Sequence, residues 1–298
     1  MSSYLELSAR ERVAKLFDEG SFVEFLPPAA RVVSPHLGQL NAPVAFDDGV
    51  AVGRALIGGM PVFAAAQEGG FMGGAVGEVH GAKLVGLLRR AVVERPAAVV
   101  LLLETGGVRL HEANAGLIAV SEVMRAVLDA RAAGIPVVAL VGGSNGCFGG
   151  MGIVARCTNA VIMSEEGRLA MSGPEVIETA AGVEEFDSRD RALVWRTTGG
   201  KHRFLMGDCR ALVADEVAAF RQAAIDAICA TQERGAPLTL ADLEAEQALL
   251  AERIERFSGL QDPSDIWGAL GIPNPQSLPM LDADAFVALA SRHRLGGA

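Results

Sequence analysis

Two continuous apolar runs with an amphipathic segment between them dominate the hydrophobic pattern of this chain. The runs over residues 98–103 and 135–141 contain no charged residue, as is typical of parallel strands that are covered on both faces. Between them, residues 115–133 carry apolar side chains at helical spacing, and Gly134 with Pro136 just beyond it predicts the end of that helix. The order strand, helix, strand predicts a β-α-β unit with a right-handed crossover.

The rest of the chain alternates between further periodic segments and turn signals. Gly58-Gly59 between two apolar runs predicts a β-hairpin, and the capping-box pattern at Ser8 predicts a helix that stops at Gly20. The pattern predicts helices over residues 8–18, 76–93, 151–155, 215–231, 239–257 and 282–291, and strands over 50–57, 61–66, 160–163 and 168–171. It also predicts a helix start at residues 173–176, an exposed charged segment at 184–191 and a polar loop at 197–202.

This alternation of strands and helices predicts an α/β fold with a mainly parallel sheet and packed helices. Gly235 and Pro237 mark residues 234–238 as the best candidate for a linker. The sequence therefore predicts one domain over residues 1–234 and a helical extension over residues 235–298.

Composition and charge narrow the class of protein. Half of the 298 residues are hydrophobic and the mean hydropathy is +0.31, so the chain can build a sizeable core and bury further surface against a partner. No apolar run is long enough to cross a bilayer, and the first residues lack the pattern of a secretory signal, which predicts a cytoplasmic protein. A net charge of −10 argues against nucleic acid as the main partner. The four cysteines have no Cys-x-x-Cys spacing, and no metal site is predicted.

Two glycine turns mark the candidate chemistry, and each follows one of the two buried strands. The first is Thr105-Gly106-Gly107, and the second ends in Gly149-Gly150. The carboxyl ends of neighbouring parallel strands meet at one sheet edge, where ligands usually bind. Glycine lets a backbone come close to a ligand, and backbone N–H groups aimed at one point form an oxyanion hole. Gly106, Gly107, Gly149 and Gly150 are therefore the predicted catalytic residues, whose amides would stabilise an enolate oxygen.

The polar residues near these turns allow two interpretations. Arg109, His111 and Glu112 follow the first glycine pair, where they could supply a proton or anchor a carboxylate, or could form only a solvated helix start. His111 is the candidate proton donor of this chain, and a residue of a partner chain is the alternative. Ser144 and Cys147 lie in the second loop, but neither a Gly-x-Ser-x-Gly elbow nor a Ser-His-Asp order supports a nucleophile.

A third glycine cluster, over residues 69–77, opens the helix predicted over 76–93. Such a turn can contact a phosphate or a pantetheine arm, or it can let a helix pack tightly on a sheet, and the residues leave both interpretations open. The candidates for the first interpretation are Gly73, Gly74, Gly77 and Lys83. None of the glycine patterns fits the Rossmann or P-loop fingerprint.

These segments resemble the carboxyltransferase β subunits of acyl-CoA carboxylases. The likeness is carried, in that family's order, by residues 10–24, 69–83, 104–112, and Gly149-Gly150 together with 170–178. It covers roughly residues 8–232 and implies a crotonase-like fold. Within the family, residues 107–117 and the extension after 235 are most similar to the β subunits of malonate decarboxylases.

The resemblance implies an enzyme subunit that works with partners. It implies a γ subunit of similar fold and an acyl-carrier protein with a CoA-like arm of the phosphoribosyl-dephospho-CoA type, whose malonyl thioester is decarboxylated to the acetyl thioester. The Gly73-Gly74 region would contact this arm, and the chain itself would bind no cofactor directly. Two alternatives stay open: a biotin-dependent acyl-CoA carboxyltransferase β subunit that uses the same enolate, and a crotonase-like scaffold without catalysis.

Overall fold

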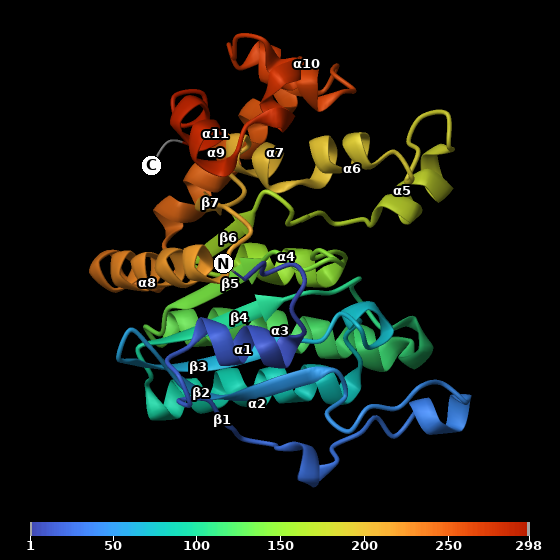
Figure 1. Cartoon of the computed structure of the whole chain (residues 1–298), viewed down its shortest axis with the longest axis vertical. Coiled ribbons are helices and arrows are strands. Elements are labelled where there is room, and N and C mark those ends of the chain that lie inside the picture. Colours follow the sequence, from blue (N-terminus) through green and yellow to red (C-terminus); the bar gives the residue numbers. More distant parts are fainter. Residues whose placement is uncertain (1, 297–298) are drawn as a thin grey trace.

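The computed structural model describes residues 2–296, which form a seven-stranded sheet with helices on both faces (Figure 1). The strands are β1 (Val23–Glu24), β2 (Val50–Ile57), β3 (Met60–Gln67), β4 (Ala98–Leu103), β5 (Val137–Val141), β6 (Ala160–Ser164) and β7 (Ala211–Val213). They lie side by side in sequence order, with antiparallel pairing from β1 to β3 and parallel pairing from β3 to β7. The predicted α/β fold with a mainly parallel sheet is confirmed.

Strand β4 shows why the sheet is buried on both faces. All six of its residues are buried, and because side chains alternate along a strand, they divide between two cores. Val99, Leu101 and Leu103 belong to the core on one face. The alternate residues of the strand belong to the core on the other face. A continuous apolar run is thus what a central strand of this sheet requires.

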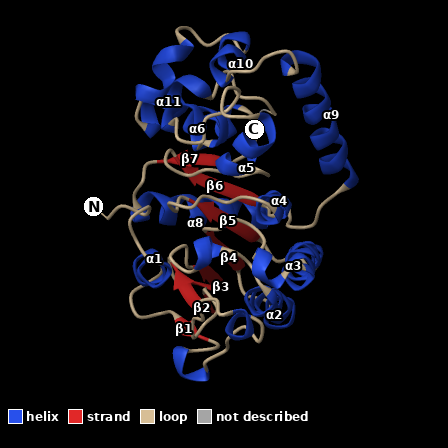
Figure 2. Cartoon of the chain, turned by 90° about the vertical axis from the view of Figure 1, so that its right-hand side faces the viewer, coloured by secondary structure: helices blue, strands red, loops and turns tan. Residues whose placement is uncertain are grey.

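Three helices on one face connect neighbouring parallel strands. They are α2 (Glu78–Glu94), α3 (Asn114–Ala132) and α4 (Gly150–Cys157), while α1 (Ala9–Leu16) and α8 (Val217–Arg234) pack on the other face (Figure 2). Since each connection returns the chain to the amino end of the next strand, the carboxyl ends of β3, β4 and β5 all open at the same edge. This topology places the two predicted glycine turns next to each other.

The later helices gather at the β7 end of the sheet (Figure 1). They are α5 (Pro174–Ala181), α6 (Arg191–Thr198), α7 (Gly200–Leu205), α9 (Leu240–Phe257), α10 (Pro263–Ala269) and α11 (Ala283–Ala290). Trp267 and Phe286 of this group belong to the same core as the sheet, and Trp267 Nε1 donates to His202 Nδ1 over 3.2 Å. The predicted boundary at residue 235 falls in the turn between α8 and α9, and the division into two domains stays a prediction.

Two local predictions are wrong, and in both cases close backbone packing is the reason. Residues 168–171 form isolated bridges beside the second glycine loop and no strand of the sheet. Residues 197–202 are not a loop, because α6 and α7 meet there with Gly199 between them. A Cβ at Gly200 would overlap the carbonyl oxygen of Ser164, so this glycine serves the packing of α7 on β6. Strands β1 and β7 and helices α6, α7 and α10 were not predicted, and the other predicted helices and strands are confirmed with ends shifted by a few residues.

Candidate active site

The two glycine loops meet at the carboxyl edge of the sheet. The Thr105 amide donates to Gly146 O over 2.8 Å, and the Phe148 amide donates to Thr105 O over 2.9 Å. Gly107 (φ 112°) and Gly149 (φ 62°) have the backbone conformations that favour glycine. A Cβ at Gly149 would lie only 3.0 Å from Gly107 Cα. The predicted contact between the loops is therefore present, and it depends on glycine at both positions.

Three of the four predicted amide donors are engaged by the protein itself. The Gly106 amide donates to Gly73 O over 2.8 Å, and the Gly107 amide donates to Thr105 Oγ1 over 3.0 Å. The Gly149 amide donates to Met171 O over 2.9 Å. The prediction that these three N–H groups face an oxyanion is therefore wrong, because each already has an acceptor.

The amides of Val108 and Gly150 remain available at the same junction. Within residues 2–296, neither N–H has a hydrogen-bond partner. The Val108 nitrogen lies 3.8 Å from the Cβ position of Gly149, the residue that precedes Gly150. Gly150 is also the first residue of α4, so its amide carries part of the positive end of the helix dipole. The candidate oxyanion donors are thus Val108 and Gly150, of which the sequence predicted only Gly150.

The Val108 amide is free because of how its neighbours pair. Val76 and Val108 form a parallel bridge, in which the Val76 amide donates to Gly107 O and the Arg109 amide donates to Val76 O, at 2.8 and 2.9 Å. Such a bridge uses the groups on either side of Val108 and leaves its own N–H unpaired. No signal in the sequence around the glycine pair indicates this bridge.

Arg109 and Glu112 are neither ligands nor a solvated helix start. The Arg109 guanidinium donates to both carboxylate oxygens of Asp48 at 2.9 Å and to Glu112 at 3.1 Å, and all three side chains are buried. Burial raises the pKa of Asp48. Burial also acts to raise the pKa of Glu112, but hydrogen bonds from Ser34 and the Glu78 amide, together with the charge of Arg109, outweigh it and hold that pKa below its ordinary value. The network fixes the chain just after Val108.

His111 remains a candidate proton donor on position alone. It lies on the short 3-10 helix Leu110–Glu112 with an exposed side chain, and within the described residues its ring has no hydrogen-bond partner. Its role stays a prediction. Ser144 and Cys147 do not form a nucleophile, because Ser144 donates to Glu104 over 3.0 Å and burial raises the pKa of Cys147 to about 12.

The third glycine cluster packs against the first turn. A Cβ at Gly74 would overlap the carbonyl oxygen of Glu104, and one at Gly77 would overlap the Glu112 carboxylate. Lys83 is buried, and its ammonium donates to backbone carbonyls, including Asp47 O at 2.8 Å. The tight-packing interpretation therefore fits Gly74 and Gly77, whose contact with a phosphate or pantetheine arm stays a prediction. The prediction for Lys83 is wrong, because its buried ammonium already donates to backbone carbonyls. Gly73 is exposed, with no other atom within 4 Å of its Cβ position, and stays a candidate contact.

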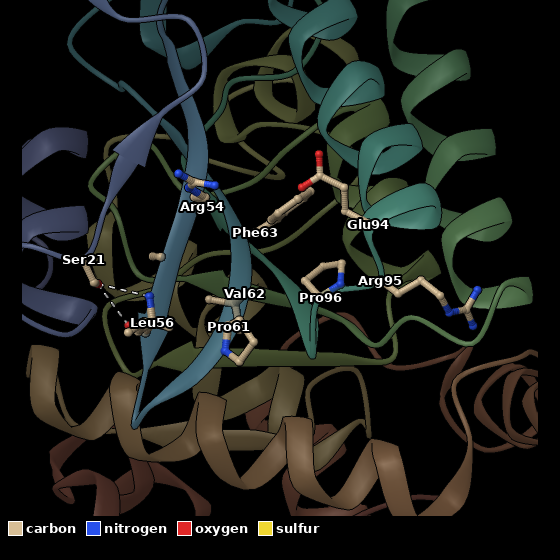
Figure 3. Close-up of a pocket in the computed structure, with 10 residues that line it drawn as sticks. Ser21, Arg54, Leu56, Pro61, Val62, Phe63, Glu94, Arg95 and Pro96 are labelled. Carbon is tan, nitrogen blue, oxygen red and sulfur yellow. Dashed lines mark hydrogen bonds between the residues drawn. The ribbon is translucent and has the colours of Figure 1, made fainter.

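The chain also has a cavity of about 350 Å³ at the opposite edge of the sheet (Figure 3). The residues that line it are Ser21, Arg54, Ala55, Leu56, Pro61, Val62, Phe63, Glu94, Arg95 and Pro96. Pro61 lies near the start of β3 and Pro96 precedes β4, so the cavity is at the amino ends of these strands. It takes no part in the site at the carboxyl ends. Between residues 2 and 296, no helix could span a membrane and no group of three His, Cys, Asp or Glu side chains could hold a metal ion.

The sheet topology and the paired glycine loops place this protein among crotonase-like folds of the carboxyltransferase type. A profile of the carboxyl transferase domain matches residues 6–222, and the chain belongs to that family. The chain is 42% identical over 306 residues to the malonyl-S-ACP:biotin-protein carboxyltransferase MADC of Malonomonas rubra, a match that covers 97% of this chain and 96% of that protein. It is 32% identical over 183 residues to the acetyl-coenzyme A carboxylase carboxyl transferase subunit beta of Fusobacterium nucleatum, with 59% of each protein covered.

Two solved structures from Pseudomonas give the corresponding structural comparison. One is a malonate decarboxylase hetero-tetramer in complex with malonate, in which one chain matches with a TM-score of 0.81 and 40% identity over 90% of this chain and 97% of that chain. The other is a malonate decarboxylase MdcD-MdcE hetero-dimer, with a TM-score of 0.65 and 38% identity over 84% of this chain and 96% of that chain.

Proposed function

We propose that this chain is the β subunit of a malonate decarboxylase, an enzyme that converts a malonyl thioester on an acyl-carrier protein to the acetyl thioester. The observation that carries the proposal is a pair of amides at the junction of the two glycine loops, those of Val108 and Gly150, which have no hydrogen-bond partner in the described part of the chain. The comparisons support the substrate class, because one relative is named for malonyl-S-ACP and one structural match is a malonate decarboxylase with malonate.

The proposed reaction needs stabilisation of negative charge more than it needs a base. The thioester oxygen accepts hydrogen bonds from the Val108 and Gly150 amides. The bond between C2 and the carboxylate carbon then breaks, carbon dioxide leaves, and the electron pair forms an enolate whose charge lies on that oxygen. One proton added at C2 gives the acetyl thioester. Each preorganised donor of this kind contributes about 2.7–4 kcal/mol to transition-state stabilisation.

Exposed side chains near the site indicate that a partner subunit binds there. Exposed apolar side chains lie on the segments that follow the two glycine loops in the chain, and exposed apolar surface of this kind marks interaction surfaces. The most exposed are Leu110 at 82% and Met171 at 69%, and the others are Leu117, Ile118 and Val176. We infer that a γ subunit of similar fold covers this rim and completes the pocket, as a hetero-oligomeric relative suggests.

The carrier's CoA-like arm of the phosphoribosyl-dephospho-CoA type would pass beside the first turn. Gly73 is the candidate contact, since its carbonyl accepts the Gly106 amide while its own Cα faces open space. Intact mass of the carrier that co-purifies with the native complex tests this part directly. A carrier without such an arm would contradict it.

The second candidate is a carboxyl transfer from the malonyl thioester to a biotin protein. The name of the 42% identical relative favours it, and the enolate chemistry in this chain would be the same. One experiment distinguishes the two candidate functions. The native complex is supplied with malonyl-carrier, and the release of carbon dioxide is followed with and without avidin. Release that is unaffected by avidin supports the decarboxylase, and release that avidin abolishes supports the biotin-dependent reaction.

A further inference from the structure

Glu104 connects the two glycine loops through its side chain. It is the first residue after β4, it is 4% exposed, and it begins the turn that leads to Gly106-Gly107. Its carboxylate oxygen Oε1 accepts hydrogen bonds from Ser144 Oγ at 3.0 Å and from the Asn145 amide at 3.2 Å. The side chain of Glu104, at the start of the first loop, therefore holds the start of the second loop.

The carboxylate is enclosed by a counter-ion and by glycines. Arg12 of α1, which is 1% exposed, donates to the second oxygen of Glu104. A Cβ at Gly69 or at Gly143 would overlap the carboxylate group. Asn145 closes the remaining side, where its side-chain amide donates to Gly69 O over 2.9 Å. Since a buried carboxylate needs a partner for each oxygen, this arrangement fixes both the group and the loops that surround it.

The backbone of Glu104, at the start of the first loop, is also held by a hydrogen bond. The Glu104 amide donates to the side chain of Gln67 at the end of β3, over 3.1 Å. The other end of the Gln67 side chain meets the buried ring of His80 at 3.1 Å. Glu104 therefore has little freedom to move, and any position that it imposes on Ser144 and Asn145 is well defined.

We propose that Glu104 is a positioning residue, which sets the distance between the Val108 and Gly150 amides by holding residues 143–150 against the first turn. The effect of this positioning on catalysis rests on the proposed function. Its carboxylate is fully occupied by Arg12, Ser144 and Asn145, so it acts through the second loop and does not contact the substrate. Small misplacements of catalytic donors are known to lower rates strongly.

The test compares Glu104→Gln with Asp208→Asn in the assembled complex. Asp208 is a matched control, because it is also buried and paired with two arginines, Arg203 at 3.0 Å and Arg253 at 2.9 Å. It precedes β7 and so lies at the opposite edge of the sheet. Two quantities are measured: hydrogen–deuterium exchange of the amides in residues 143–150, and kcat and KM for the malonyl-carrier.

For Glu104→Gln we expect exchange in residues 143–150 to rise at least about tenfold, since hydrogen bonds to a charged acceptor are lost. We expect kcat to fall at least about tenfold while KM stays within about threefold, the pattern of an interaction realised in the transition state. Asp208→Asn should loosen residues near 208 and leave exchange in the second loop unchanged. Unchanged exchange in residues 143–150 of the Glu104 variant overturns the proposal, whatever happens to kcat.

Ser144→Ala keeps the test decisive if the Glu104 variant does not fold. This substitution removes one bond to the carboxylate without changing a buried charge, and Ser144 itself is exposed. Faster exchange of the Gly146–Gly149 amides supports the proposal, and wild-type exchange overturns it. If the wild-type complex releases no carbon dioxide, the proposed function fails, while the exchange comparison still decides whether Glu104 holds the loop.

Discussion

Replacement of Gly150 by proline removes one N–H from the proposed oxyanion site and leaves helix α4 able to form. Gly150 is the first residue of the helix, a position at which proline is well tolerated, and among residues 2–296 its amide has no hydrogen-bond partner to lose. Any Cβ at this position would lie 2.7 Å from Val120 Cγ1. We therefore place Gly150→Pro and its control, Gly150→Ala, in the same Val120→Ala background. Both variants then carry a Cβ in the same enlarged space, and only the alanine variant retains the N–H.

The expected difference follows from the contribution of one preorganised donor. Removing such a donor costs about 2.7–4 kcal/mol in the transition state, which corresponds to a kcat lower by about 10²–10³-fold in the proline variant than in the alanine variant. Carbon dioxide release from saturating malonyl-carrier gives kcat, and size-exclusion chromatography establishes that both variants assemble with their partners. The KM values should agree within about threefold, because the substrate carbonyl carries little charge before the reaction.

Equal turnover of the two assembled variants would refute the reasoning. A kcat for the proline variant within about threefold of the alanine variant would show that the Gly150 amide does not stabilise the transition state. The scaffold alternative would then be favoured, since a partner would have to supply the catalytic groups. Loss of turnover in both variants would instead indicate that the packing against Val120 controls the loop, and the oxyanion argument would lose its main support.

Three further predictions concern the Arg109 network, the buried histidines and the thiols of the chain. Because Arg109 neutralises two buried carboxylates, Arg109→Met should lower the free energy of unfolding in urea by about 3–5 kcal/mol, and a change below about 1 kcal/mol would contradict the network. Burial lowers the pKa of His80 and His202 to about 3, from an ordinary value of 6.5. Stability is therefore complete above about pH 6.5 and falls as the pH drops towards 3, by about 1.4 kcal/mol per pH unit for each histidine, which urea unfolding at a series of pH values measures. Iodoacetamide at neutral pH should modify the exposed Cys229 and leave the buried Cys147 intact, and mass spectrometry that finds Cys147 alkylated in the native protein would contradict this.

The sheet and the place of the site could be predicted from the sequence because their signals are local. The apolar run of β4 matches the predicted strand at both ends, since a strand buried on both faces admits no polar residue. Once β4 and β5 are known to be consecutive parallel strands, the rule for carboxyl edges brings their following turns together. That step needs no knowledge of side-chain packing, and it correctly placed Gly107 against Gly149.

The donors themselves could not be predicted, because glycine marks close approach and carries no information on which amide is free. Gly106 and Gly149 are close to other backbone segments, and those segments accept their N–H groups. The free amide of Val108 depends on a bridge to Val76, a contact between distant parts of the chain. Lys83 was misjudged for a related reason, since only the folded structure brings the carbonyl of Asp47 to its ammonium group.

The charged groups around the loops divide the proposed chemistry between this chain and its partner. Arg109 pairs with both Asp48 and Glu112, and Glu104 pairs with Arg12, so the buried charges near the loops are committed to the fold. What this chain offers an incoming thioester is therefore a pair of backbone donors of fixed geometry. The acceptor of the carboxyl group would then lie beyond the exposed apolar rim, where the second subunit is expected, and the final proton would come either from that subunit or from the exposed His111. Decarboxylation and carboxyl transfer to biotin would accordingly use the same pair of backbone donors in this chain. Which of the two reactions takes place would be determined by the residues that the partner places opposite Gly150.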